Sequence, residues 1–340
     1  MQPRLKKYLQ TGAGFLLAVA FLYLAFRGVS FKELWASLQD VDYFWVGVLV
    51  PIVVVSHWLR AVRWRYFLDP VKEHISVRNL FSGVMIGFMV NNLLPRVGEV
   101  TRAVAVGRSE KISTSSVFGT VVIERIVDMA TFLFILCAVL FIYPSSLDPF
   151  VDNAHAVRPF FFVGGIGFLL FFVFLFFKAA SLFRLLEYLK RFVPRGFEVK
   201  YQSILDSFLS GFGVAKMRSK YGMIALLSVL IYTSYAMSLY VPFFAFHTMA
   251  GHNLDIGASF ILLTISTIAF AFPAPGALGT YHQFLSFALV RLYGVDTLTA
   301  LSFAIITHEV GYIITTAVGL YYFFKDHLRM SEVVNATTDN

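Results

Sequence analysis

Residues 91–102 hold the side chains best suited to bind an anion in an otherwise apolar chain. Their charged members, Arg96, Glu99 and Arg102, are spaced three apart, so a helix that begins after Pro95 would place them on or near one face. A guanidinium pairs with two phosphate oxygens at once, and the free N–H groups of a helix start add positive potential. We therefore expect Arg96 and Arg102 to bind an anionic lipid headgroup, with Glu99 as a countercharge or proton carrier. The alternative is that both arginines only lie at headgroup level.

The same stretch contains a break in the chain. Pro95 and Gly98 end a short apolar run, and the amides Asn91 and Asn92 precede the break. Asn92 is assigned to the headgroup site. The alternative role for the amides is to satisfy backbone groups that a broken helix leaves unpaired.

A later apolar segment carries Glu124, Arg125 and Asp128. Ionised side chains inside a bilayer are costly, so they tend to pair or to face a cavity. We expect Arg125 to assist headgroup binding and the two acids to take part in charge or proton coupling. The alternative is a self-neutralising bridge between Arg125 and Asp128, three residues apart, that only holds helices together.

A second break lies far downstream, at residues 272–279. Its helix-breaking residues are Pro275, Gly276 and Gly279. His282 follows on the returning arm, and a later span carries His308 and Glu309. These three residues are candidates for proton coupling, although hydrogen bonding alone would also explain the buried histidines. His247 and His252, in an outer loop, show no metal-ligand spacing. No nucleotide-binding motif occurs either, so neither a metal nor another cofactor is expected.

Composition sets the class of protein. The chain has 340 residues, of which 58% are hydrophobic and only 14% charged. Apolar runs of about 20 residues predict an all-α, polytopic membrane protein. Six full spans are predicted, at 10–27, 43–62, 118–142, 159–178, 221–247 and 299–324. Two shorter segments, 79–107 and 257–290, are predicted to be re-entrant helical hairpins that do not cross the membrane.

The distribution of Lys and Arg predicts the orientation. If both hairpins turn back, most basic residues lie on one side, and only Arg27, Lys32, Arg158 and Arg291 lie on the other. The positive-inside rule then predicts that both termini lie in the cytoplasm. The protein is expected to be a multi-pass protein of the cell (cytoplasmic) membrane. Arg60 and Arg63 count here as charges on the cytoplasmic side, and Arg60, near the cytoplasmic end of its predicted span, is a weaker site candidate. Residues 1–330 are expected to form one domain with a cytoplasmic amphipathic segment at 181–217, and residues 331–340 a disordered tail.

The two halves of the chain, about 43–142 and 221–324, follow the same order. In each, an apolar run ends at a proline and a glycine, a short helix follows, and a span with charged residues comes next. Since the hairpins enter from opposite sides, this predicts an inverted repeat. Secondary transporters bind their substrates at broken helices in repeats of this kind.

These motifs together resemble the lysylphosphatidylglycerol synthase transmembrane family. The resemblance rests on Asn92 to Pro95 with Gly98, Glu99 and Arg102, on residues 124–128, and on residues 275–279. It implies a flippase-like membrane domain, similar to the N-terminal part of the multiple peptide resistance factor. Two departures are evident: the soluble aminoacyl-transferase domain is absent from this chain, so lysine transfer is not expected, and His282 stands where family members often have glutamate.

We therefore predict a transporter, rather than an enzyme, for an anionic phospholipid or a lipid-linked intermediate. One alternative is a membrane-embedded transferase that uses Glu99 or Asp128 as general base on a lipid-linked donor. Another is a scaffold that docks a partner enzyme on the basic segment 181–220. No nucleic-acid partner is expected, because the basic residues lie beside spans.

Overall fold

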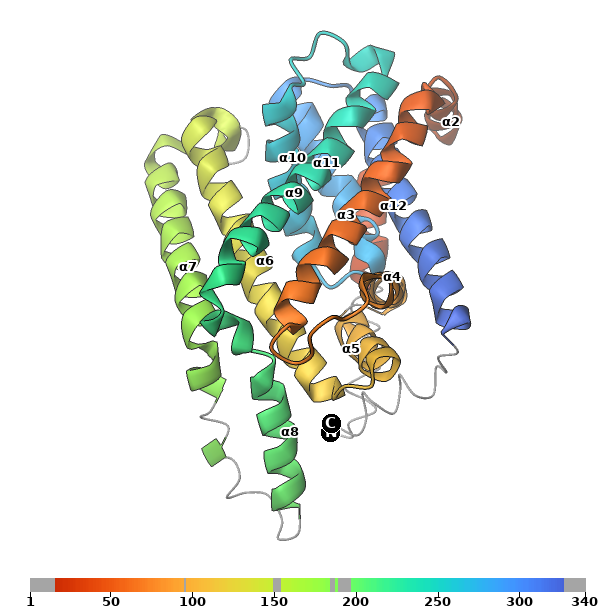
Figure 1. Cartoon of the computed structure of the whole chain (residues 1–340). Coiled ribbons are helices and arrows are strands. Elements are labelled where there is room, and N and C mark those ends of the chain that lie inside the picture. Colours follow the sequence, from red (N-terminus) through yellow and green to blue (C-terminus); the bar gives the residue numbers. More distant parts are fainter. Residues whose placement is uncertain (1–15, 95, 149–153, 184–186, 189–196, 327–340) are drawn as a thin grey trace.

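The computed structural model describes residues 16–94, 96–148, 154–183, 187–188 and 197–326 (Figure 1). Over these residues the chain is α-helical with short 3-10 turns and holds no strand. The predicted all-α, polytopic fold is confirmed. The predicted tail 331–340 and residues 184–186 and 189–196 of the predicted amphipathic segment 181–217 fall outside the described residues.

Within the described part of the chain, five helices are long and apolar enough to cross a membrane. They are α3 (Tyr43–Leu68), α6 (Thr114–Ile142), α7 (Ala154–Phe183), α9 (Tyr221–Tyr240) and α12 (Thr297–Lys325). Each overlaps a predicted span. The first predicted span is described only as the helix Leu16–Phe26.

The two predicted hairpins are pairs of shorter helices. The first is α4 (Val77–Leu93, 17 residues) followed by α5 (Val97–Glu110, 14 residues). The second is α10 (Ile256–Ala271, 16 residues), the 3-10 turn η7 (Pro275–Ala277) and α11 (Thr280–Tyr293, 14 residues). None of these arms reaches the roughly 20 residues that a spanning helix needs.

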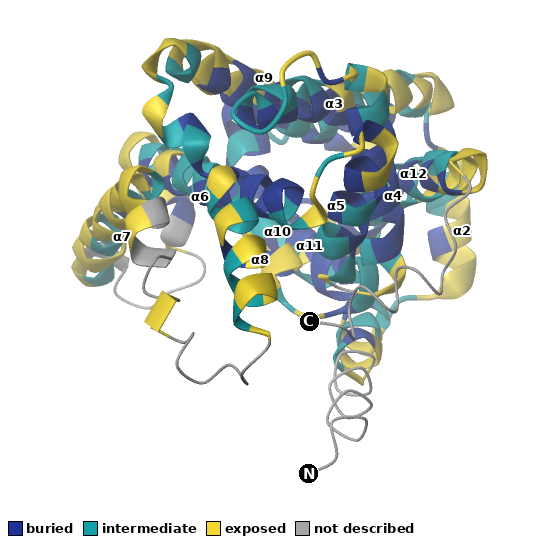
Figure 2. Ribbon diagram, turned by 60° about the horizontal axis from the view of Figure 1, so that its bottom comes forward, coloured by how far each residue is buried: buried dark blue, intermediate teal, exposed yellow. Residues whose placement is uncertain are grey.

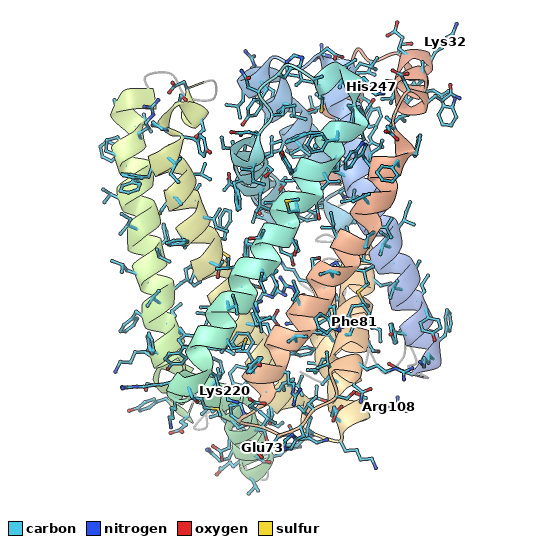
Figure 3. The ribbon with its side chains drawn as sticks, turned by 45° about the horizontal axis from the view of Figure 1, so that its top comes forward. Lys32, Glu73, Phe81, Arg108, Lys220 and His247 are labelled. Carbon is cyan, nitrogen blue, oxygen red and sulfur yellow. The ribbon has the colours of Figure 1, made fainter. Side chains whose placement is uncertain are left out.

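The hairpins start at opposite ends of the molecule and meet at their tips. Figure 3 labels Arg108, near the base of the first hairpin, at one end, and His247, just before the second hairpin, at the other. At the tips, a Cβ added to Gly276 would lie 3.2 Å from the Asn92 carbonyl oxygen. Each hairpin is followed by a 29-residue helix, α6 or α12. This repeated order with opposed entry is the predicted inverted repeat.

The remaining elements lie around this core. They are α2 (Phe31–Gln39), α8 (Glu198–Ser210) and the 3-10 turns Pro144–Leu147, Gly213–Lys216, Arg218–Lys220, Val241–Ala245 and His247–Met249. Helix α7 lies beside α6 and is exposed over most of its length (Figure 2). Its phenylalanines Phe160 and Phe168 are among the exposed residues. An exposed apolar face of this kind suits contact with lipid.

Side-chain caps fix where several helices begin. The carboxylates of Asp42, Asp255 and Asp296 accept hydrogen bonds from backbone N–H groups in the first turns of α3, α10 and α12, at 2.8 to 3.0 Å. Such caps satisfy donors that a helix start leaves unpaired. They fix the residues at which α3, α10 and α12 begin.

Small residues let the arms of the first hairpin approach closely. A Cβ on Gly98 would lie 2.0 Å from the Gly87 carbonyl oxygen, so α5 can pack on α4 only with glycine at this position. Gly319 of α12 packs in the same way on the backbone of α4 at Met85. Helix α4 is therefore held on two sides through glycine contacts.

Replacing Gly98 by alanine should destabilise the protein, because its new methyl group would force α4 and α5 apart. We expect a loss of about 1–3 kcal/mol, as for other overpacked cores, measured as a lower midpoint of thermal unfolding in detergent. The matched control is Gly47→Ala in α3, where a Cβ meets nothing within 4 Å. Equal midpoints for the two variants would contradict the close approach.

The base of the first hairpin is fixed by Glu110. Its carboxylate accepts hydrogen bonds from Lys72 Nζ at 2.8 Å and from Asn79 Nδ2 at 2.7 Å, and a longer one from the Ser76 N–H. Burial alone would raise the pKa of Glu110, but these donors and the Lys72 charge lower it below its ordinary value of about 4.5. The unfolded chain therefore binds this proton more readily than the folded one.

The contribution of Glu110 to stability should depend on pH. Because its pKa is lowered on folding, the contribution is complete above about pH 4.5 and is lost as the pH falls through the lowered value. Thermal unfolding of wild type and Glu110→Gln across this range checks the expectation. The wild type should be the more stable at pH 7, and the difference should vanish in acid. A difference that grows on acidification would show the wrong sign.

Candidate functional site

A cluster of guanidinium and carboxylate groups lies between α3, α5 and α6, with Glu124 at its centre. Glu124 Oε1 accepts from Arg60 Nη1 at 2.8 Å, and Glu124 Oε2 accepts from Arg102 Nη2 at 2.6 Å. Arg63 Nη2 lies 3.4 Å from the same carboxylate. The Glu124 side chain is fully buried. One acid thus joins arginines from two other helices.

Asp128, one turn further along α6, is the second acid of the cluster. Its two carboxylate oxygens lie 2.5 Å from Arg63 Nη2 and 3.1 Å from Arg60 Nη1. Arg125 Nη1 lies 3.5 Å from Asp128, so the predicted bridge three residues apart is present. It is one contact in a larger network and does not neutralise the pair in isolation.

Arg60 and Arg63 are the functional residues that sequence reasoning misplaced. They count there as charges on the cytoplasmic side, Arg60 at the end of its span and Arg63 just beyond it. Helix α3 instead continues to Leu68 and buries both, with 5% and 0% of their side chains exposed. Helix α9 supplies further partners: Tyr235 OH accepts from Arg60 and Ser228 Oγ from Arg63. The available signal was that Arg60 and Arg63 share one face of a helix, as do Glu124 and Asp128.

Aromatic rings cover the cluster. The Arg102 guanidinium lies 4.5 Å from the centre of the Trp64 ring, and the Arg60 guanidinium 5.7 Å from the Phe88 ring. Stacking on aromatic faces suits the planar, weakly hydrated guanidinium. Where the rings cover these ionic contacts, the less polar surroundings strengthen the contacts.

The cluster carries more positive than negative charge among the described residues. Its members are the arginines 60, 63, 102 and 125 and the acids Glu99, Glu124 and Asp128. The buried Nε groups of Arg63, Arg102 and Arg125 have no hydrogen-bond partner within the described chain. A surplus cation with unused donors is a site that favours an anion.

A cavity of about 70 Å³ opens beside these groups. Arg102, Arg125 and Glu99 line it together with Asn91, Gly98, Val84, Gly87 and Phe88. Arg125 and Glu99 have 41% and 26% of their side chains exposed and lie 3.9 Å apart at Nε and Oε1. The cavity has room for several water molecules and connects the buried cluster to the exterior.

The other residues expected in the headgroup site lie elsewhere. Arg96 is exposed at the tip, in left-handed backbone with φ 69°, and is not among the arginines that contact Glu124 or Asp128. Asn92 Nδ2 donates to Thr316 Oγ1 at 2.9 Å and Thr315 Oγ1 at 3.1 Å, so it holds the tip of α4 against α12. Pro95 lies outside the described residues.

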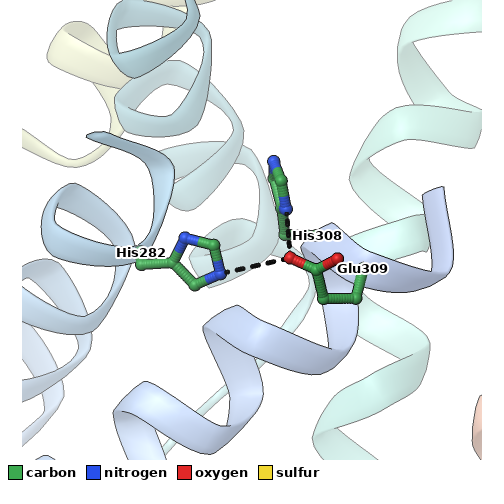
Figure 4. Close-up of side chains that lie close together, drawn as sticks. All are labelled: His282, His308 and Glu309. Carbon is green, nitrogen blue, oxygen red and sulfur yellow. Dashed lines mark hydrogen bonds and ion pairs between the residues drawn. The ribbon is translucent and has the colours of Figure 1, made fainter. Parts of the chain in front are cut away.

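His282, His308 and Glu309 form a second group at the tip of the second hairpin (Figure 4). Glu309 Oε1 lies 3.0 Å from His308 Nδ1 and 3.7 Å from His282 Nε2. Both histidines are buried, whereas 36% of the Glu309 side chain is exposed. One ligand atom from each of the three residues lies within 4.8 Å of the others.

Left-handed backbone shapes this tip. Gly276, Ala277 and Gly279 have φ values of 55°, 56° and 80°, and the one at Ala277 is costly for a residue with a side chain. The turn directs the Gly276 carbonyl to His308 Nε2, which donates to it at 2.8 Å. Pro275 precedes this turn at the start of η7.

The described residues give no ion pair or hydrogen bond that joins the two charged groups directly. The two neighbouring asparagines of α4 connect them instead. Asn91 Oδ1 accepts from the Gly98 N–H at 2.8 Å and Asn91 Nδ2 donates to Glu99, on the side of the arginines. Asn92 binds α12, which carries His308. The tips therefore meet, but their charged residues form two separate sites.

The sequence of the chain is similar to those of known membrane proteins. The family model described as the lysylphosphatidylglycerol synthase TM region matches residues 12–319. No solved structure matches the chain.

Curated relatives come from archaea. The chain is similar over its whole length to a protein named glycosyltransferase AglD from Haloferax volcanii, with 23% identity. It is 29% identical over 131 residues to a UPF0104 membrane protein of Methanocaldococcus jannaschii and 31% identical over 129 residues to one of Pyrococcus horikoshii. The matches span 58%, 38% and 37% of the lengths of these three relatives.

Removing the central charge should be far more harmful than removing a peripheral one. Glu124→Gln leaves buried arginines without their counterion, which costs about 3–5 kcal/mol in buried ion pairs. Glu99→Gln alters a partly exposed contact and should cost about 1 kcal/mol or less. Reversible unfolding in mixed micelles measures both variants. Equal stability of the two would show that Glu124 does not organise the cluster.

Proposed function

The chain belongs to the lysylphosphatidylglycerol synthase transmembrane family, and from this premise we propose that it is a lipid transporter of the flippase type. Its substrate is an anionic phospholipid or a lipid-linked intermediate. The phosphate of the headgroup binds in the cavity lined by Arg102 and Arg125 and passes between leaflets.

One observation carries the proposal: a net positive cluster with unused Nε donors borders a cavity between the first hairpin and α6. A phosphate group supplies the negative charge and acceptor oxygens that this site lacks. Arg102 is fixed by Glu124 and Trp64, so it serves as the rigid donor. Arg125 has only longer ionic contacts, at 3.9 Å to Glu99 and 3.5 Å to Asp128, and its partly exposed side chain lines the cavity, where it can meet a ligand.

The inverted repeat supports movement of the bound headgroup. In transporters of this architecture, one repeat rocks against the other and exposes a central site to each side in turn. Here the hairpin tips meet at Gly276 and Asn92, so either hairpin can act as a gate on the same contact. The acyl chains would follow the outer helices through the membrane.

The proposed orientation places both termini in the cytoplasm and the protein in the cell membrane. The end of the molecule that carries Arg108 and Lys220 in Figure 3 would then face inward. The opposite end, with Lys32, would face outward. Basic residues gather on the cytoplasmic side of most membrane proteins.

A second candidate is a membrane-embedded transferase that acts on a lipid-linked donor. It is favoured by the name of the Haloferax volcanii relative, a glycosyltransferase of which the chain matches 58%. Glu99, partly exposed in the cavity, would be the general base. Under this alternative, purified protein would convert a lipid-linked sugar, and Glu99→Gln would abolish the conversion.

Headgroup binding should depend on Arg125 more than stability does. We expect Arg125→Gln to weaken phosphatidylglycerol binding about tenfold to a hundredfold, or roughly 1.4–2.7 kcal/mol, because a charge-assisted contact is lost. Native mass spectrometry of the protein with phosphatidylglycerol measures binding. Fluorescent phosphatidylglycerol in liposomes, quenched from outside, measures transfer between leaflets.

The matched control is Arg291→Gln, which removes an exposed arginine that lies over the Phe287 ring, away from the cluster. It should bind and transfer lipid as the wild type does. Wild-type protein that folds but transfers no anionic lipid would overturn the transporter. Equal losses in both variants would show only a general effect of surface charge.

A further inference from the structure

We propose that His282, His308 and Glu309 form a proton-binding site at the tip of the second hairpin. One exchangeable proton lies between His308 Nδ1 and Glu309 Oε1. This site does not require lipid binding. Its coupling to the headgroup site is a separate step that rests on the proposed function.

The argument begins with the two ring nitrogens of His308. Nε2 lies 2.8 Å from the Gly276 carbonyl oxygen, which can only accept, so Nε2 carries a hydrogen. Nδ1 lies 3.0 Å from Glu309 Oε1. A neutral ring with hydrogen on Nε2 has a lone pair on Nδ1, and an ionised carboxylate would present another lone pair to it. Two such acceptors at 3.0 Å repel unless a proton lies between them.

In His282 the backbone holds the other ring nitrogen, Nδ1, and holds it as an acceptor. The Gly279 N–H donates to His282 Nδ1 at 3.4 Å, so the single hydrogen of the neutral ring lies on Nε2. Nε2 faces Glu309 Oε1 at 3.7 Å. His282 therefore directs a fixed N–H toward the carboxylate and stabilises its charge, while His308 shares the exchangeable proton.

The same hydrogen bond argues against a metal ion. A metal bound by this group needs lone pairs on both His308 Nδ1 and His282 Nε2. The Gly279 N–H supports a lone pair on His282 Nδ1 instead, which leaves hydrogen on the nitrogen that would have to bind the metal. The cluster thus fits a proton better than a divalent cation.

The surroundings isolate the proton from other charges. Among the described residues, the ionisable groups in contact with the Glu309 carboxylate are His308 and His282. Helix α11 adds Tyr281, whose hydroxyl donates to Thr307, and α12 adds Tyr312, whose ring lies 5.9 Å from that of His308. Helix α10 contributes the Phe270 ring. Among the described residues, the other neighbours bring no charge to this tip. Helix α4 contributes the Asn92 amide, and the helix Leu16–Phe26 packs its backbone against Gly279. Arg60 and Arg63 of α3 pair with Glu124 and Asp128 instead.

The proton is positioned to move the hairpin tip. The Gly276 carbonyl that holds His308 belongs to the left-handed turn, and Gly276 contacts the Asn92 backbone of the first hairpin. Loss of the proton would set the lone pairs of His308 and Glu309 against each other. His308 would then lose its contact with either Glu309 or the Gly276 carbonyl. Loss of the Gly276 contact would release the tip of the second hairpin from α12.

The direct test is the protonation state of His308 in the full chain. Protein with ¹⁵N-labelled histidine rings is placed in phosphatidylcholine liposomes and titrated by solid-state NMR from about pH 4 to pH 9, the range that brackets histidine. We expect the spectrum of His308 to show the shared proton, either as a ring with both nitrogens protonated or as a neutral ring beside a protonated Glu309. As the pH rises, the pair should lose this proton in a single step. His308→Gln should remove this signal. His282 should keep hydrogen on Nε2 throughout.

A second variant keeps the test valid if His308→Gln does not fold. Glu309→Gln removes the negative partner, so His308 should lose its proton at least about one pH unit lower than in the wild type. His252→Gln is the matched control, because His252 Nδ1 pairs with the Tyr293 carbonyl in a loop, and it should leave the step unchanged. A singly protonated His308 beside an ionised Glu309 at every pH would overturn the proposal. So would stoichiometric Zn²⁺ binding that shifts the signals of both His282 and His308.

The coupling step is tested by lipid binding at two pH values. The affinity for phosphatidylglycerol should change about tenfold between pH 5.5 and pH 8 in the wild type, within the usual range of coupling between sites. It should change less than about twofold in Glu309→Gln. A protein that titrates at His308 but never binds lipid would refute the proposed function and leave the proton site standing. Lipid binding with the same pH dependence in both proteins would refute the coupling.

Discussion

The attraction between the Glu124 carboxylate and the guanidinium groups around it is the constraint on which the first half of the structure depends. Arg60, on α3, and Arg102, on α5, must both reach one buried acid on α6. Helix α5 must therefore lie across α6 at a fixed height, and it reaches that position only by folding back tightly on α4. The Gly87–Gly98 contact, which leaves no room for a Cβ, makes this close return possible. An electrostatic requirement thus dictates a packing requirement.

The two halves use one architecture for different chemistry. A guanidinium stays charged at every physiological pH, whereas an imidazole gains and loses its proton within that range. The first half accordingly has a permanent positive charge beside a cavity, and the second has two histidines beside one acid. The His282 position illustrates the difference. An N–H directed at Glu309 is available from histidine but would not be available from an ionised glutamate.

The sequence predicts the helix breaks at the hairpin tips better than it predicts which charged residues pair with one another. Proline and glycine within short apolar runs indicate both hairpins, because few other residues end a helix inside a membrane, and Glu124 and Asp128 stand out as charges in a long apolar span. Arg60 and Arg63 could not be placed in the same way. They lie near the end of a span, where arginine is common at the cytoplasmic boundary, and only the length of α3 and its packing on α6 and α9 reveal them as buried. Asn92 is misleading for a related reason: its neighbour Asn91 lines the cavity, but consecutive residues of a helix point in different directions.

That divergence of neighbouring residues places one turn of α4 in contact with both sites. Asn91 holds Gly98 and Glu99 on the arginine side, and Asn92 holds Thr315 and Thr316 on α12. Because both amides extend from the same turn of α4, neither side can shift by a helical step without breaking hydrogen bonds on the other. The ends of the two hairpins, in contact at Gly276, are then bound to one rigid segment. In the described residues no charged contact joins the two sites, so α4 is the segment through which a movement at one site would have to reach the other.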